Sequence, residues 1–228
     1  MTVKPLARIV VSLAAICAVA ACSSTESARR TSHTSDGDVV AAVTTNPEPA
    51  FRLVVTQPGN EVRYRVREQL VGHDLPNDAV GATDAVTGQI TFAADGTVIP
   101  DSSKITIDVT GLKSDQSRRD RFVQGRLLET AKFPTVVFEP TFVRGAPKAL
   151  PIAGSTAFSL LGNLTVKGVT RPATWHVSTK FGPDTVSGSA STSFAFADFA
   201  ITQPRVPVLL SVADTIKLEF DFRLAVKK

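Results

Sequence analysis

Apolar and polar residues alternate along most of the chain after residue 60. The alternation is clearest in these segments: 62–67, 104–110, 136–142, 160–167, 174–181 and 216–224. A period of two residues is typical of an antiparallel strand with one side buried and the other in water. The pattern therefore predicts an all-β domain with about eight antiparallel strands.

Turn residues separate these segments, and only one stretch has the spacing of a helix. The turn sequences are Asp95-Gly96, Arg144-Gly145 and Gly182-Pro183-Asp184. In the stretch 114–128, Ser114 or Asp115 is the expected cap, and Phe122, Val123 and Leu127 give an apolar side. A closed barrel protects strand edges, so we expect an eight-stranded antiparallel barrel with one short inserted helix.

The N-terminus has the features of an export signal. Lys4 and Arg8 precede an uncharged run, 9–21, that is shorter than the roughly 20 apolar residues of a membrane-spanning helix. The run ends in Val19-Ala20-Ala21-Cys22, which looks like the lipobox of bacterial lipoproteins. This motif predicts lipidation at Cys22, and the alternative is ordinary secretion with cleavage after the same small residues.

These features divide the chain into three parts. We expect a signal peptide over 1–21, a flexible tether over 22–50 that is rich in Ser, Thr and Ala, and a barrel domain over 51–228. Cys17 would leave with the signal, so Cys22 would be the only cysteine of the mature chain. The predicted location is the cell envelope outside the cytoplasmic membrane, with a lipid anchor that holds the protein on the periplasmic or outer-surface side of a membrane.

The charge of the chain argues against nucleic-acid binding. Removing Lys4 and Arg8 from 25 basic residues leaves 23 against 21 acidic ones, or +2. The basic residues are also scattered rather than gathered in an aromatic-lined stripe. Arg63, Arg65 and Arg67 share one face of a predicted strand. We interpret them as a solvated outer face, with contact to anionic lipid headgroups as the weaker alternative.

The sequence lacks the usual patterns of an enzyme or a metal site. His33, His73 and His176 do not pair at metal-ligand spacing, and there is no Gly-x-Ser-x-Gly elbow or Gly-rich phosphate loop. His176 lies next to Trp175 after a tight connection at Gly168 and Pro172, and alternation places it on the wet face. We therefore expect no metal and no cofactor, and a hairpin at this position.

The inward positions are mostly aromatic and aliphatic. As ligand-contacting residues we single out Tyr64, Phe92, Phe138, Phe142, Leu160, Leu164, Trp175, Phe194, Phe220 and Phe222. An eight-stranded barrel either is filled by its own side chains or keeps room for one ligand. The residues alone leave these two alternatives close to even.

The chain resembles the YceI-like polyisoprenoid-binding family. The resemblance rests on Arg119-Asp120 in the predicted helix, on Lys132-Phe133-Pro134-Thr135, on Val137-Phe138 and on the run GNLTVKGVTRP at 162–172. It implies a lipocalin-like barrel whose elongated apolar interior binds amphiphilic lipids such as isoprenoid quinones or polyprenyl phosphates. It also implies a periplasmic or secreted protein without known catalysis.

The sequence departs from this family in two places. The first strand, 61–68, lacks the histidines that many members carry, and the signature near residue 198 keeps Asp198 and Phe199 but not the family's Arg and Gly. These departures leave the fold expectation intact and leave the headgroup open.

Together these observations predict a non-catalytic carrier, buffer or sequestering protein for an isoprenoid or similar lipid. The alternatives are an envelope scaffold with a filled barrel and, less favoured, a lipid-modifying enzyme using Asp120 or His176. Arg119 and Asp120 are expected to pair structurally, with action on a headgroup as the other option. The segment 72–85 is a candidate lid, and 206–212 is a candidate lip of the barrel or an edge strand.

Overall fold

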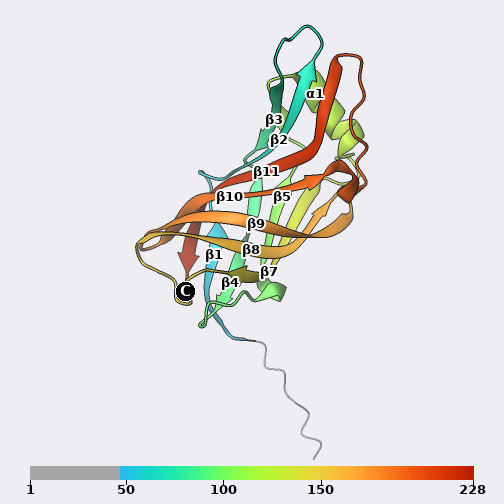
Figure 1. Ribbon diagram of the computed structural model, residues 1–228. Helices are drawn as coiled ribbons and strands as arrows, with labels where there is room; N and C mark the ends of the chain where they lie inside the picture. Colours follow the sequence, from blue (N-terminus) through green and yellow to red (C-terminus); the bar gives the residue numbers. More distant parts are fainter. Residues whose placement is uncertain (1–46) are drawn as a thin grey trace, which may run out of the picture. The chain divides into compact units, whose positions relative to one another are not determined.

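The computed structural model of the protein describes residues 47–228 (Figure 1). The predicted signal peptide, Cys22 and most of the predicted tether lie outside the described residues. The first strand begins at Pro49, just before the predicted domain boundary at Phe51.

Within the described residues the chain forms eleven strands, one α-helix and three other short helical segments. The strands are β1 (Pro49–Val55), β2 (Glu61–Leu70), β3 (Asn77–Thr83), β4 (Val86–Ala93), β5 (Lys104–Asp108), β6 (Lys113–Ser114), β7 (Thr135–Arg144), β8 (Gly154–Val166), β9 (Val169–Phe181), β10 (Thr185–Ala195) and β11 (Leu209–Lys227). The helical segments are α1 (Ser117–Phe122), a π-helical turn η2 (Val123–Leu127), and the 3-10 turns η1 (Pro100–Ser102) and η3 (Phe196–Phe199). No helix of this region is long and apolar enough to span a bilayer.

The strands close into an antiparallel ring. The order is β1-β4-β5-β7-β8-β9-β10-β11, and β11 returns to β1 through register pairs such as Arg52 with Lys227. The three remaining strands extend the sheet beyond this ring. β2, which follows β1 in the chain, pairs with β11; β3, which precedes β4, pairs with β2; and β6, which follows β5, pairs with β3. The predicted eight-stranded antiparallel barrel with a short helix is therefore confirmed.

Alternation along the strands separates the interior from the outer face as predicted. On β9, Trp175 and Val177 are buried, while His176 is exposed and pairs in register with Ser159 and Ser191 of the neighbouring strands. His176 is thus on the outer face of a β8–β9–β10 sheet, as the sequence indicated.

The predicted inward position of Phe142 is wrong. The register of β7 with β8 shifts between Pro140 and Phe142, so an extra residue enters β7 there. A bulge of this kind exchanges the two faces of the strand beyond it. Phe142 is consequently 52% exposed, and Val143 occupies the inward position instead.

The helix is shorter and begins later than predicted. Gln116 is the residue before α1 and makes no side-chain capping bond. Ser114 instead donates from its backbone N–H and its hydroxyl to Asp120 Oδ1, at 2.8 and 2.6 Å. Asp120 therefore ties the end of β6 to the helix, and Ser114 and Asp115 do not act as the predicted caps.

The outer-face interpretation of the arginine row on β2 is confirmed. Arg63 pairs with Glu61 and Asp221, and Arg65 and Arg67 both contact Asp78. These partners lie on β2 itself and on the neighbouring strands β3 and β11.

Candidate ligand-binding cavity

The barrel is hollow at one end and nearly filled at the other. A cavity of about 1060 Å³ occupies the end near α1, and a second cavity of only about 110 Å³ lies at the opposite end. Val62, Ile107 and Trp175 line both, so they mark the boundary between them. Pockets for small ligands usually measure about 300–1,000 Å³, so the larger cavity has the size of a ligand site.

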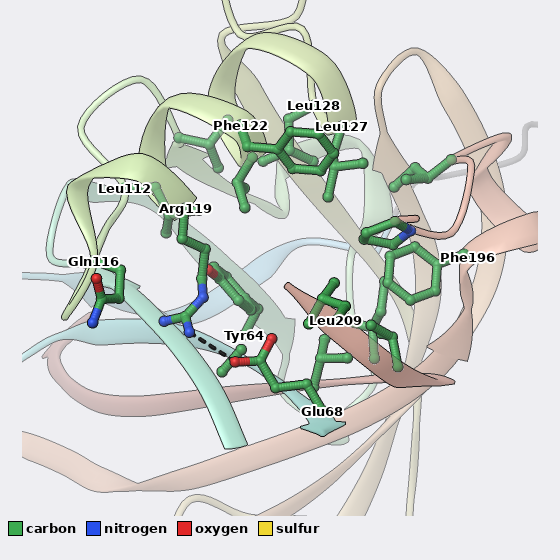
Figure 2. A pocket seen from close by; sticks show the side chains of 18 of the residues that line it. Tyr64, Glu68, Leu112, Gln116, Arg119, Phe122, Leu127, Leu128, Phe196 and Leu209 are labelled. Carbon is green, nitrogen blue, oxygen red and sulfur yellow. Dashed lines mark hydrogen bonds and ion pairs between the residues drawn. The ribbon is translucent and has the colours of Figure 1, made fainter. Parts of the chain in front are cut away.

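The wall of the larger cavity is mainly apolar and comes from most strands of the barrel. Inward residues of β2, β3, β5 and β7 to β11 form its sides, the segment 204–208 before β11 adds to them, and α1 with η2 covers part of the end. Figure 2 shows Phe122, Leu127 and Leu128 from the helical segment facing Leu209 and Phe196 across the space. Such a wall favours a hydrocarbon ligand, because it offers few hydrogen-bonding groups.

The predicted interior residues divide between the two cavities. Those that line the larger cavity are Tyr64, Leu164, Trp175 and Phe194. Those that line the smaller one, together with Trp175, are Phe92, Phe138, Leu160, Phe220 and Phe222. Phe142 lines neither. Contact of these residues with a ligand stays a prediction.

Aromatic pairs fill the smaller end. Phe51 and Phe92 stack with ring centroids 4.9 Å apart, and Phe138 packs against Trp175 at 5.8 Å. The indole Nε1 of Trp175 is buried without a hydrogen-bond partner among the described residues. Trp175 is the only tryptophan of the chain, so its fluorescence reports on the boundary between the cavities.

A polar cluster interrupts the apolar wall beside α1. Arg119 Nη2 donates to Glu68 Oε1 at 2.8 Å (Figure 2). Arg119 also pairs with Asp115. The Glu68 side chain is only 8% exposed and also accepts from Asn77 Nδ2 at 3.3 Å. The predicted pairing of Arg119 with Asp120 is wrong, because Asp120 is bound to Ser114 and Arg119 reaches across to β2.

The cluster carries no excess positive charge. Burial opposes the charge of Arg119, but Glu68 and Asp115 outweigh this effect and hold the pKa of Arg119 above its ordinary value. Burial also raises the pKa of Tyr64 to about 12. At neutral pH the cluster therefore presents an ion-paired guanidinium and, close to it, a protonated phenol.

The position of Tyr64 depends on a glycine in the next strand. Gly81 is the register partner of Tyr64, and the phenol ring lies directly over it. A methyl group at Gly81 would meet Tyr64 Cε1 at 2.3 Å. Only a residue without a side chain leaves room for the ring, which is a frequent reason for glycine within a strand.

Sequence reasoning missed several residues of the cavity. Glu68 follows Tyr64 and Val66 at the same two-residue spacing, so the alternation along this strand already placed its carboxylate on the inner face. The sequence therefore contained a signal for a charged residue inside the barrel that the prediction did not include. The predicted lid, 72–85, is only partly a loop, because β3 occupies half of it and the loop is limited to its first residues, among which His73 lines the cavity. The predicted lip, 206–212, does line the larger cavity, and from Leu209 onward it also belongs to β11.

The described residues contain no group of three or more His, Cys, Asp or Glu side chains arranged to hold a metal ion.

Comparison with solved structures supports the assignment of the fold. A polyisoprenoid binding domain from Saccharophagus degradans, implicated in plant cell wall breakdown, matches with a TM-score of 0.58 at 13% identity, over 79% of this chain and 100% of that one. The crystal structure of BcnA from Burkholderia cenocepacia matches with a TM-score of 0.53 at 19% identity, over 74% and 96%.

Comparison with sequences identifies the family. A UPF0312 protein of Yersinia pestis is 30% identical over 95 residues, which cover 41% of this chain and 45% of that protein. A UPF0312 protein of Pseudomonas aeruginosa is 33% identical over 75 residues, or 32% and 35%. The matches thus span less than half the length of these curated relatives. The YceI-like domain matches residues 54–224, nearly the whole described barrel, and the chain therefore belongs to the YceI-like domain family.

Proposed function

We propose that the protein binds an isoprenoid or another amphiphilic lipid, without catalysis, and holds the lipid tail in the larger cavity. The observation that carries this proposal is the cavity of about 1060 Å³ with its mainly apolar wall. The fold is shared with a polyisoprenoid binding domain, and the family consists of binding proteins. The role would be that of a carrier, buffer or sequestering protein.

The energy for binding comes from burial of the tail. Apolar surface removed from water contributes roughly 25 cal/mol per Å². A few hundred Å² of buried tail therefore yields several kcal/mol, part of which offsets the entropy lost on association. No covalent step is needed for this function.

The polar cluster is the proposed contact for the headgroup. Glu68 and Asp115 already balance the guanidinium of Arg119, so the cluster itself offers a phosphate no free positive charge. Arg118 and Arg121, which have no carboxylate partner among residues 47–228, line the opening of the cavity instead. Tyr64 stays protonated at physiological pH and retains its hydroxyl as a donor. The cluster therefore favours an uncharged, hydrogen-bonding headgroup, such as that of an isoprenoid quinone, over a polyprenyl phosphate.

The proposed site of action is the cell envelope outside the cytoplasmic membrane. This part of the proposal is supported by the sequence alone: the charged and apolar run before Cys22 and the small residues next to it. An acylated Cys22 would keep the barrel close to the bilayer that supplies its ligand.

A fluorescence titration tests the binding and the headgroup preference together. An isoprenoid quinone added to the full chain should change the emission of Trp175, which lines the cavity. The matching prenyl alcohol should then displace the quinone better than the prenyl phosphate does. Absence of any change in emission contradicts the proposed function, and better displacement by the phosphate contradicts the headgroup assignment.

A variant of the cluster provides the matched control. Glu68→Gln keeps the shape of the side chain but removes one of the two carboxylates that balance Arg119. This change should shift the preference towards the phosphate while the quinone tail still binds. An unchanged preference would mean that the headgroup lies away from the cluster.

A further inference from the structure

Four large apolar side chains are exposed around the open end of the larger cavity. Val71 is 56% exposed, Leu75 77%, Val208 54% and Leu210 64%. We call these four residues the mouth rim. Val71 and Leu75 belong to the loop between β2 and β3, and Val208 and Leu210 belong to the start of β11 and the residues before it. Figure 1 shows both segments at the same end of the barrel, near α1.

The mouth rim is one connected structure. Val71 N–H donates to the carbonyl of Val208 at 3.0 Å, and Leu209 pairs in register with Leu70. Because these bonds join the two segments, their exposed side chains project from a common edge. Contiguous exposed apolar surface on a soluble domain is typical of an interaction site.

The mouth rim is continuous with the interior of the barrel. Val71 and Val208 are exposed to solvent and also line the larger cavity. An apolar path therefore leads from the outside of the domain into the site proposed for the lipid tail. At the opposite end, Ile152 is 79% exposed but lines neither cavity.

Unpaired positive charges flank the same opening. Arg118 and Arg121 of α1 line the cavity, and Arg205 lies just before the mouth rim. Within residues 47–228 none of the three has a carboxylate at ion-pair distance, in contrast to Arg119. Asp74 of the loop between β2 and β3, Asp214 of β11 and the carboxylates of the polar cluster are opposing charges at this end, so the arginines give no net excess of charge. The three guanidinium groups without a carboxylate partner are nevertheless free to contact anionic lipid headgroups.

We propose that the mouth rim inserts into the surface of a lipid bilayer that contains anionic lipids, with Arg118, Arg121 and Arg205 contacting the headgroups. The inference rests on the proposed function, since it supplies the route by which a lipid enters the cavity. A tail that passes from the bilayer directly into the barrel never exposes its apolar surface to water. The occupant is a bilayer rather than a protein because the apolar path leads into a cavity suited to a membrane component.

Site-specific labelling tests which end of the barrel contacts a bilayer. In the full chain with Cys17 and Cys22 replaced by serine, Leu75→Cys and Ile152→Cys each provide a single attachment point for a polarity-sensitive dye. The two positions are equally exposed, at 77% and 79%, so the label at position 152 is a matched control.

Vesicles of phosphatidylcholine and phosphatidylglycerol should shift the emission of the dye at position 75 to shorter wavelength. Lipids that carry a nitroxide in the acyl chain should quench it. The dye at position 152 should show neither effect. Equal responses at both positions, or none at position 75, would overturn the proposal and leave the mouth rim as a surface for another partner.

The arginines are tested by their effect on affinity. Arg118→Gln and Arg121→Gln should each weaken binding to the anionic vesicles about fivefold, from the roughly 1 kcal/mol per basic residue near such a surface, and should leave binding to pure phosphatidylcholine unchanged. Equal losses on both vesicle types would contradict the role of charge.

The same samples separate this inference from the proposed function. A change in Trp175 emission with an isoprenoid quinone, without a response at position 75, refutes only the docking of the mouth rim. Absence of both signals refutes the lipid-binding function as well.

Discussion

Two alanines at opposite ends of the barrel test whether one end is hollow and the other filled. Ala79 on β3 is 5% exposed and lines the larger cavity, and Ala190 on β10 is 8% exposed and lines the smaller one. The perturbation is the same at both positions: Ala→Phe adds a phenyl ring that points into the barrel.

The two cavity volumes give opposite expected effects. A cavity of about 150 Å³ is known to hold benzene. The larger cavity, at about 1060 Å³, therefore has room for the phenyl ring of Ala79→Phe, and the smaller cavity, at about 110 Å³, has no room for that of Ala190→Phe. Burial of a phenylalanine side chain contributes about 1.5–3 kcal/mol, of which roughly 1 kcal/mol is lost to side-chain entropy. Overpacking costs about 1–3 kcal/mol. We therefore expect Ala79→Phe to raise the free energy of unfolding by about 0.5–2 kcal/mol and Ala190→Phe to lower it by about 1–3 kcal/mol.

Urea denaturation measures the difference. The midpoint should rise for Ala79→Phe and fall for Ala190→Phe, with an unchanged slope in both. Ala79→Phe should also weaken lipid binding, since the ring occupies space meant for the tail. Equal destabilisation by the two substitutions would refute the reasoning, because it would mean that the larger cavity is closed by packing in solution.

The remaining predictions concern single side chains. Tyr64 is the only tyrosine, so the absorbance of its phenolate should titrate with a midpoint of about 12 in the folded protein. The raised pKa favours the folded state below pH about 10, and this contribution to stability is lost as the pH rises through about 12. A folded-state midpoint near 10 would contradict the burial and place Tyr64 in water. Gly81→Ala brings a methyl group 2.3 Å from the Tyr64 ring and should lower the free energy of unfolding by about 1–3 kcal/mol. Adding Tyr64→Leu to this variant should recover part of the lost stability, and no recovery would argue against the contact. Hydrogen bonds from Lys217 and Arg65 lower the pKa of Glu219, so the contribution of Glu219 to stability is present above its usual pKa and is lost as the pH falls through the lowered value. Glu219→Gln should remove this part of the acid dependence of the free energy of unfolding, measured by urea denaturation. An unchanged acid dependence would contradict the lowered pKa.

The fold was predictable because its signal is local and repeated. Each strand shows its buried side through alternation, and an antiparallel meander needs only short connections between neighbours. The failure at Phe142 has an equally local cause. The bulge near Pro140 shifts the register by one residue, and the sequence pattern did not distinguish this from a regular strand.

The cavity was less predictable because its volume depends on contacts between distant parts of the chain. A filled barrel and a hollow one use the same inward residues, and the difference lies in how α1 and the segment before β11 cover one end. Arg119 pairs with Glu68 across 51 positions of sequence, and Tyr64 needs Gly81 on the next strand. Glu68 is the exception, since its place in the alternation was visible in the sequence.

The proposed anchor at Cys22 and the proposed docking of the mouth rim are compatible with each other in distance. β1 begins at Pro49, and Phe51 in the same strand lines the smaller cavity, so the chain enters the barrel at the end away from the mouth rim. Twenty-seven positions separate Cys22 from Pro49, and at about 3.3–3.6 Å each a fully extended chain of this length reaches at most about 90–100 Å. The longest strand, β11, has 19 residues and spans about 60 Å, so a lipidated Cys22 and the mouth rim can reach the same bilayer.

Native mass spectrometry of the protein purified from its own host tests the central claim most directly. If the larger cavity holds a membrane lipid, the spectrum of the intact protein should contain a species heavier by one isoprenoid, which dissociates on activation and is identified by its mass. That species should be reduced in Ala79→Phe. A consistently unliganded spectrum for the wild-type protein, with no isoprenoid or other lipid in its extract, would contradict the account.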